Sequence, residues 1–233
     1  MPSSIPTDPF ELKHLSKLHP YRLFWTAYNR SLDRMGQLVQ KPLLQKMERL
    51  SPEFIFPDRG VPINDTAVTS QQMDLLKLAI ERTLTLHQPL VEIGSYRGIT
   101  TSHLASITPN TVYAVDPYIG YGGWEDDFTI FSENTSDFKN IKFLRMTSGS
   151  AYQELRQQKL SFVFIDAVHD FGNTWFDFFS WSSLVVPGGL IAMHDVDDFP
   201  GTHLAFRKIA ARREKYKVWG YCPNLAVIQK LTD

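Results

Sequence analysis

The sequence has little cysteine, little net charge and no long apolar run. The 233-residue chain has a single cysteine, Cys222, which excludes an internal disulfide and a zinc site built from cysteines. Its net charge is −1 with acids and bases interspersed, so we expect neither nucleic acid nor a membrane as a partner. No apolar run approaches the roughly 18 residues that span a bilayer, and no opening segment resembles a secretion signal. These absences predict a soluble, cytoplasmic protein.

The first 65 residues differ in pattern from the rest. Apolar side chains recur at helical spacing up to about Leu50, and a stretch with three prolines then reads as an extended linker from Ser51 to Asp65. We expect residues 1–65 to be a helical extension that covers the active site or forms a homodimer contact, because its amphipathic stripes need a partner surface. Residues 66–233 form a second unit, in which a capping box of Thr69 and Gln72 opens a helix.

From Pro89 onward, short apolar runs alternate with helical segments. The predicted strands are Leu90–Ile93, Thr111–Val115, Ile141–Arg145, Phe162–Ile165, Leu190–Met193, Lys217–Tyr221 and Leu225–Gln229. The predicted helices are Ile99–Ile107, Asp127–Phe138, Ser150–Gln158, Asn173–Leu184 and Gly201–Arg213. Continuous apolar strands indicate a parallel sheet covered on both faces. The pattern predicts an α/β fold with a Rossmann-like, doubly wound, mostly parallel seven-stranded sheet that ends in an antiparallel hairpin.

Candidate functional residues directly follow the predicted strands, where an open parallel sheet binds its ligands. Gly94 and Gly98 follow the first strand as Gly-x-x-x-Gly. This spacing differs from the Gly-x-Gly-x-x-Gly that holds a diphosphate, which favours a cofactor without one. Glu92 is an acid inside an apolar strand and requires a hydrogen-bonding or cationic partner. Asp116 ends the second strand, where a carboxylate can accept two ribose hydroxyls or can cap a turn.

The ends of the later strands carry more polar groups. Ser148 and Gly149 follow the third strand and suit an adenine contact or a helix cap equally. The fourth and fifth strands deliver two acidic segments with histidines, Asp166-Ala167-Val168-His169-Asp170 and His194-Asp195-Val196-Asp197-Asp198. Neighbouring strands lie about 4.8 Å apart, so Asp166 and Asp195 can point into one site with His169 above them. This concentration of titratable groups favours a functional site.

Four segments in this order resemble the successive motifs of class I S-adenosylmethionine-dependent methyltransferases. They are VEIGSYRGITTSHLA, VYAVDPY, FVFIDAVHDF and LVVPGGLIAMHDV. The resemblance covers roughly Thr69 to Asp233, and its closest branch is that of sugar and small-molecule O-methyltransferases with a His-Asp pair after the fifth strand. It implies a transferase that uses S-adenosylmethionine and methylates a hydroxyl of a sugar, phenol or natural product.

The resemblance also implies roles for individual residues. The cofactor would contact Glu92, Gly94, Ser95, Gly98, Thr100, Asp116, Ser148, Gly149 and Asp166. Glu92 would lie at the amino end of its methionine part, Asp116 at the ribose, and Ser148 with Gly149 near the adenine. His169 would be the general base, and Asp166 would be a second catalytic residue beside it. Histidine suits the role of general base because its ordinary pKa lies near neutral pH.

A metal site is a further implication, although the family pattern is changed at one of its positions. The resemblance implies a divalent metal held by Asp166, His194 and Asp195. His194 stands where relatives have an oxygen ligand, and a His/Asp set suits magnesium less well than manganese, iron or zinc. The sequence therefore leaves open whether any metal binds.

Three other functions stay open at this stage. The histidines and carboxylates after the fourth and fifth strands, together with His203, could serve a metal-dependent oxygenase or hydrolase. A nicotinamide oxidoreductase shares the sheet, but the missing third glycine and the acid-rich end of the fifth strand argue against it. A non-catalytic nucleotide-binding protein is the third alternative, because a fold does not establish a function. The sequence favours an enzyme that acts on a small molecule.

Overall fold

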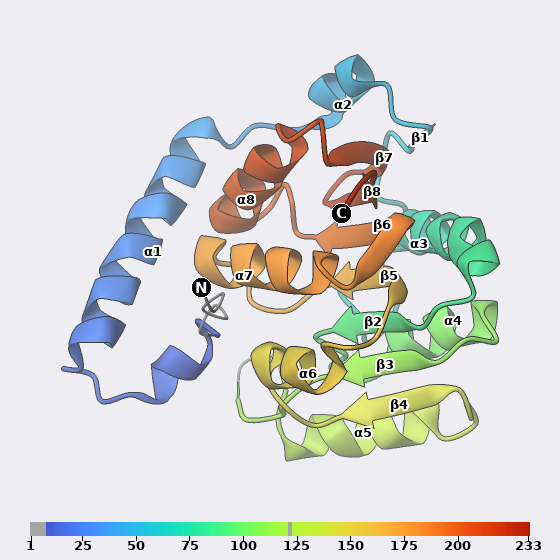
Figure 1. Cartoon of the computed structure of the whole chain (residues 1–233), viewed down its shortest axis with the longest axis horizontal. Helices are drawn as coiled ribbons and strands as arrows, with labels where there is room; N and C mark the ends of the chain where they lie inside the picture. Colours follow the sequence, from blue (N-terminus) through green and yellow to red (C-terminus); the bar gives the residue numbers. More distant parts are fainter. Residues whose placement is uncertain (1–7, 121–122) are drawn as a thin grey trace.

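The computed structural model describes residues 8–120 and 123–233, and its centre is one sheet with helices on both faces (Figure 1). The described strands lie in the order β1-β7-β8-β6-β5-β2-β3-β4. Their bounds are β1 Phe54–Ile55, β2 Leu90–Ile93, β3 Val112–Val115, β4 Ile141–Leu144, β5 Leu160–Ile165, β6 Val185–His194, β7 Tyr216–Cys222 and β8 Leu225–Lys230. Among them only β8 runs antiparallel to its neighbours, so the predicted mostly parallel sheet with a terminal hairpin is confirmed.

Helices cover the sheet because alternate side chains of each strand point to opposite faces. The helices are α1 Pro20–Val39, α2 Leu44–Leu50, α3 Ser70–Thr83, α4 Ile99–Ile107, α5 Glu125–Thr135, α6 Ser148–Leu155, α7 Phe171–Ser182 and α8 Pro200–Ala210, with short 3-10 turns η1 at Glu11–His14 and η2 at Leu84–Leu86. One core includes α2, α6, α7 and α8 and takes Val163 and Ile165 from β5. The other includes α3 and α4 and takes Phe162 and Phe164.

Two features of the sheet differ from the sequence prediction. The sheet has an eighth described strand, β1, which pairs in parallel with β7 inside the stretch interpreted as a linker. Two residues are too few to show a period, so only long-range pairing reveals this strand. The other difference is that β6 begins at Val185, five residues before the predicted strand Leu190–Met193, and the added residues lie opposite an irregularity between Leu160 and Phe162.

The helices after β2 lie close to their predicted positions. The bounds of α4 agree with the prediction, whereas those of α5, α6, α7 and α8 differ by one to three residues. The side chains of Thr147 and Asp170 accept backbone N–H groups at the starts of α6 and α7, and so begin these helices earlier than predicted. The predicted capping box of Thr69 and Gln72 is present.

The N-terminal extension packs onto the rest of the protein. Leu43 and Met47 are buried in the same core as the strands β5 and β6. Helix α1 lies along α7 and α8 at one side of the molecule (Figure 1). Among the described helices, none is long and apolar enough to cross a bilayer.

Candidate active site

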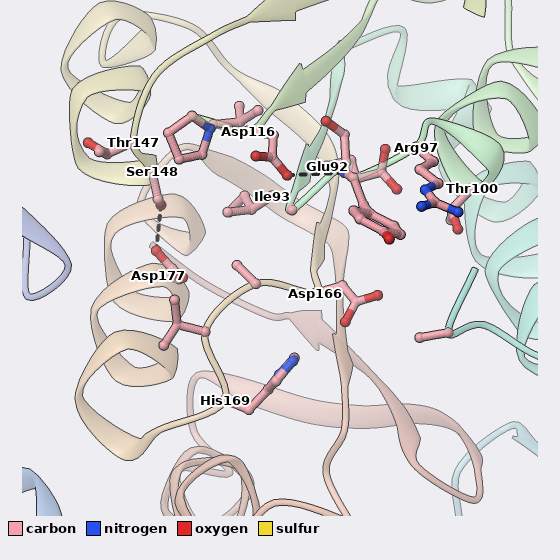
Figure 2. A pocket seen from close by; sticks show the side chains of 18 of the residues that line it. Glu92, Ile93, Arg97, Thr100, Asp116, Thr147, Ser148, Asp166, His169 and Asp177 are labelled. Carbon is pink, nitrogen blue, oxygen red and sulfur yellow. Dashed lines mark hydrogen bonds between the residues drawn. The ribbon is translucent and has the colours of Figure 1, made fainter. Parts of the chain in front are cut away.

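The order of the strands reverses between β2 and β5, and a cavity lies at this point. The chain passes from β2 to β3 and β4 on one side, and then returns to β5 on the other side of β2. The carboxyl ends of these strands surround a cavity of about 260 Å³ (Figure 2). Of the predicted cofactor residues, those that line it are Glu92, Gly94, Ser95, Gly98, Thr100, Asp116, Ser148 and Asp166. His169 lines it too.

Gly94 and Gly98 allow close packing of the backbone beside this cavity. Gly94 has φ +90°, and a Cβ atom there would lie 2.0 Å from the carbonyl oxygen of Asp166. Gly98 has φ +76° at the start of α4, and a Cβ there would lie 2.9 Å from the Phe131 ring. Gly94 makes its tightest contact with the backbone after β5, and Gly98 makes its tightest contact with α5.

Glu92 is a fully buried acid whose partner is a hydroxyl group. Its carboxyl accepts a hydrogen bond from Thr101 of α4, which supplies the partner that the sequence required. Burial raises the pKa of Glu92 to about 8, and the nearby charges of Asp166 and Asp116 act in the same direction. Around neutral pH the cavity therefore contains a largely protonated carboxyl group that a cationic ligand can ionise.

Asp116 both caps a turn and lines the cavity. One carboxylate oxygen accepts the backbone N–H of Tyr96 at 3.1 Å, and the other accepts that of Tyr118 at 3.0 Å. Burial raises the pKa of Asp116, against the lowering effect of these two hydrogen bonds. Figure 2 shows its carboxylate turned into the cavity between Ser148 and Thr100. Asp116 can therefore cap this turn and still offer its carboxylate to a ribose, the two roles that the sequence left open.

The start of α6 closes the cavity on the side of the N-terminal extension. The Ser148 hydroxyl donates to Asp177 and accepts from the Trp181 indole N–H at 2.8 Å. The backbone N–H of Gly149 donates to Asp8 at 2.8 Å, so Gly149 lies behind Asp8 and outside the cavity lining. Sequence analysis missed Asp8 and Phe10 as lining residues, because local patterns do not show where an extension folds back.

The buried carboxyls predict that stability falls as pH rises. Burial raises the pKa of Asp177, like that of Glu92, to about 8. Between pH 4.5 and 8 the native state keeps protons that the unfolded chain has lost. We therefore expect the free energy of unfolding to fall by on the order of 1 kcal/mol per pH unit and per carboxyl. Urea unfolding of the cofactor-free protein from pH 5 to pH 8 measures this slope, and Asp177→Asn should make it shallower. Stability that rises over this range would refute the assignment.

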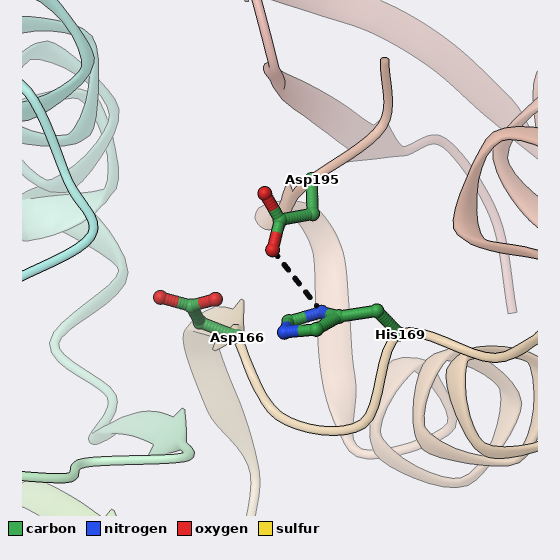
Figure 3. A group of neighbouring side chains, drawn as sticks. All are labelled: Asp166, His169 and Asp195. Atoms are coloured by element: carbon green, nitrogen blue, oxygen red, sulfur yellow. Dashed lines mark ion pairs between the residues drawn. The ribbon is translucent and has the colours of Figure 1, made fainter. Parts of the chain in front are cut away.

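Two carboxylates and a histidine meet at the ends of β5 and β6. The Nδ1 atom of His169 lies 3.2 Å from Oδ2 of Asp195. Figure 3 shows the other ring nitrogen of His169 turned toward Asp166. One ligand atom from each of the three residues lies within 4.8 Å of the others. The His169 ring also packs against Phe199, with 4.4 Å between ring centroids and the ring planes tilted by 35°. The sequence prediction that these three side chains converge is confirmed.

His194 lies beneath this cluster and faces both carboxylates. Its Nδ1 atom is 3.1 Å from Oδ1 of Asp166 and 3.4 Å from Oδ1 of Asp195. Burial lowers the pKa of His194, but the two carboxylates outweigh burial and raise it to about 10. His194 is therefore a buried cation at neutral pH, and it neutralises one of the two charges above it.

This arrangement fits a divalent metal poorly. The predicted ligand set was Asp166, His194 and Asp195, whereas the geometry groups the two carboxylates with His169. His194 already supplies a positive charge to the same carboxylates, so a divalent ion bound there would face another cation. His203 lies apart from this group, since its Nδ1 atom is 2.9 Å from the Val196 carbonyl oxygen. We derive no catalytic step from a metal.

Asn224 orders the loop after β6, and sequence analysis missed it. It lies in the turn between β7 and β8 with φ +71°. Its side-chain N–H₂ donates to Asp195 at 2.6 Å, and its side-chain oxygen accepts the backbone N–H groups of Asp197 and Asp198, each at 3.1 Å. An asparagine in a short turn is an ordinary feature of sequences. Its contact with Asp195 depends on β8 lying beside β6, which local patterns do not reveal.

Comparison with known proteins identifies the kind of domain. Residues 91–196 match a family model described as a methyltransferase domain. These residues run from β2 to the loop after β6 and are similar to a methyltransferase domain. The methyltransferase prediction is thereby confirmed, and the methyl donor of this class is S-adenosylmethionine. No curated protein matches the chain in sequence.

Solved structures of methyltransferases share the fold of this domain. The O-methyltransferase TomG from Streptomyces achromogenes, solved with its cofactor, is 16% identical over 89% of this chain and 98% of its own, with a TM-score of 0.56. An O-methyltransferase from Bacillus cereus is 19% identical over 73% and 84%, with a TM-score of 0.54. An rRNA methylase from Streptococcus thermophilus is 15% identical over 70% and 95%, also with a TM-score of 0.54. At these identities the likeness shows the fold alone.

Proposed function

We propose that the protein transfers the methyl group of S-adenosylmethionine to a hydroxyl oxygen of a small molecule. The observation that carries this proposal is the position of the cavity between the glycine turn after β2 and the pair of His169 and Asp195. The cavity offers Ser148 to an adenine, Asp116 to a ribose and Glu92 to an amino group. Two solved neighbours described as O-methyltransferases support the choice of oxygen.

His169 is suited to remove the proton of the acceptor hydroxyl. When bound, the cofactor supplies an electrophilic methyl carbon on its sulfonium. Nδ1 of His169 lies 3.2 Å from Oδ2 of Asp195, and a proton held between these two atoms would leave Nε2 to take the proton of the hydroxyl. Transfer of that methyl carbon to the acceptor oxygen would break its bond to sulfur, and Nε2 of His169 would take the hydroxyl proton. Asp166 lies on the side that this nitrogen faces and can orient the acceptor (Figure 3).

The charge around the cavity favours a small molecule over a nucleic acid. Asp65 and Asp166 line it, and Arg97, the arginine in its lining, is paired with Asp65 and Asp127. Such a site would repel a phosphodiester backbone, which needs unpaired cations. Asp8 and Phe10 also line the cavity, which supports the proposal that residues 1–65 cover the site of a domain formed by residues 66–233.

Calorimetric titration tests cofactor binding. We expect saturable binding of S-adenosylmethionine and S-adenosylhomocysteine. Asp116→Asn should weaken both roughly tenfold or more, because a buried hydrogen bond to a charged group is lost. Asp126→Asn is the matched control, since Asp126 is exposed on α5 outside the cavity. If the native protein shows no saturable binding of either molecule, the proposed function is wrong.

A chelator tests the role of His194 as the internal cation. We expect methyl transfer to be unchanged after treatment with EDTA, because His194 already balances the carboxylates. The measurement is the rate of transfer from radiolabelled cofactor to a panel of sugars and phenols, with and without EDTA. Activity that EDTA abolishes and added Mn²⁺ or Mg²⁺ restores would instead establish a metal enzyme.

A further inference from the structure

Helix α1 packs Leu32 and Val39 against α7 and α8, but it also presents a row of large apolar side chains to the solvent. Its buried residues are Asn29 and Gly36, and exposed large apolar side chains lie on its outer side at Tyr21, Phe24, Tyr28, Met35 and Leu38. The exposed fractions reach 72% for Tyr21, 68% for Phe24 and 84% for Leu38. We define the outer face of α1 as the exposed apolar side chains of Tyr21, Leu23, Phe24, Tyr28, Met35 and Leu38, together with that of Leu18 in the turn just before the helix. A surface helix usually buries such a face, so its exposure needs an explanation.

Polar contacts hold α1 in this orientation. Asn29 accepts the backbone N–H of Gly172 at 2.8 Å, and Asp33 accepts that of Phe171 at 3.1 Å. Gly36 packs against α8, where a Cβ atom would lie 2.1 Å from the Pro200 carbonyl oxygen. The inner side of α1 is therefore matched to the first turns of α7 and α8. Rotation that buried the outer face would break these contacts.

The same orientation of α1 places the acid of this segment on the inner side and leaves its cations on the outer side. Asp33 is the one acid between Leu15 and Lys41, and it points inward to α7. The exposed cations beside the outer face are Lys17, Arg30, Arg34 and Lys41. Within the described part of the chain, none of these four forms an ion pair, so their charges are uncompensated. The outer surface of α1 is apolar and cationic without a matching acid.

We propose that α1 docks the protein on a membrane surface that contains anionic lipids. The outer face would insert among the lipid chains near the headgroups, while the four cations would contact the headgroup phosphates. Charge complementarity favours an anionic lipid surface over a second copy of the chain or an RNA. Two copies of α1 would bring cations against cations with no acid between them, and an RNA would leave the leucines of the outer face without an apolar partner.

This proposal changes one expectation from the sequence. The net charge of −1 gave no reason to expect a membrane partner, because whole-chain charge does not show which side of a helix an acid occupies. The structure turns Asp33 inward and leaves the cations outward. The proposal is independent of the proposed methyl transfer, since none of the residues of the outer face lines the cavity.

Vesicle sedimentation of the full chain tests the proposal. We expect binding to vesicles of phosphatidylcholine mixed with phosphatidylglycerol, and much weaker binding to phosphatidylcholine alone. Leu38→Asp and Arg34→Glu should each reduce binding to the mixed vesicles by about tenfold. The matched controls are Leu231→Asp and Lys139→Glu, which make the same changes at exposed positions away from α1. Circular dichroism and S-adenosylhomocysteine binding establish that each variant is folded.

Four results would overturn the proposal. One is the absence of binding to the mixed vesicles. Another is binding that Leu38→Asp and Arg34→Glu reduce no more than their controls do. The third is a stable dimer in solution, seen by light scattering, that Leu38→Asp separates; the outer face would then be a contact between two copies. Binding of a single-stranded RNA that competes with the vesicles would likewise assign the surface to nucleic acid.

Discussion

Replacing His169 by alanine is expected to lower methyl transfer by roughly 10²- to 10⁴-fold, the usual contribution of a general base. The binding of S-adenosylhomocysteine should change little, because the proposed role of His169 concerns the acceptor. The measurements are kcat with an active acceptor and the dissociation constant of the product cofactor. His103→Ala is the matched control, since His103 is exposed on α4 and bonds within that helix.

The result separates a catalytic histidine from a structural one. If His169→Ala keeps normal kcat, the histidine has no part in proton removal. Asn224→Ala provides a second readout, because Asn224 holds Asp195 and Asp195 orients His169. It should lower kcat more than it raises KM, and the bound cofactor should be unaffected. An equal loss in the binding of cofactor would indicate a general effect on the fold.

Replacing Gly94 by alanine is expected to abolish cofactor binding and to destabilise the protein by roughly 3 kcal/mol or more. The added Cβ atom would lie 2.0 Å from the Asp166 carbonyl oxygen, so the turn after β2 and the turn after β5 must separate. Both turns line the cavity, and their separation would displace Asp116 and Asp166 from the ligand. Calorimetric titration and urea unfolding measure the two effects.

Gly188→Ala is the control that separates the effect of the steric clash from the effect of the backbone strain. Gly188 has φ +87°, close to that of Gly94, but a Cβ atom there would meet nothing within 4 Å. We expect this variant to lose only about 1 kcal/mol of stability, which a left-handed conformation costs alanine. If the two variants are equally stable and both bind the cofactor, close contact between the two turns is not required for the site.

The sequence determined the class of fold and most of the cavity. Continuous apolar runs and helical periods are local, and they located each strand from β2 to β8 within one or two residues, except for the start of β6. A parallel sheet brings the ends of its strands to one edge, so the order of the strands alone assigns residues such as Glu92, Asp116 and Asp166 to that edge. The convergence of Asp166, His169 and Asp195 followed from the same rule.

Other features depend on contacts between distant segments, and only the tertiary structure decided them. Strand β1 exists because Phe54 and Ile55 pair with β7, and Asn224 reaches Asp195 because β8 lies beside β6. From its position in the sequence we expected His194 to be a metal ligand. In the structure it is buried beneath two carboxylates that raise its pKa, so it acts as their counter-ion. The direction in which α1 faces is likewise set by its partners on α7 and α8. A helical period shows that a helix has two sides, but not which side the rest of the protein covers.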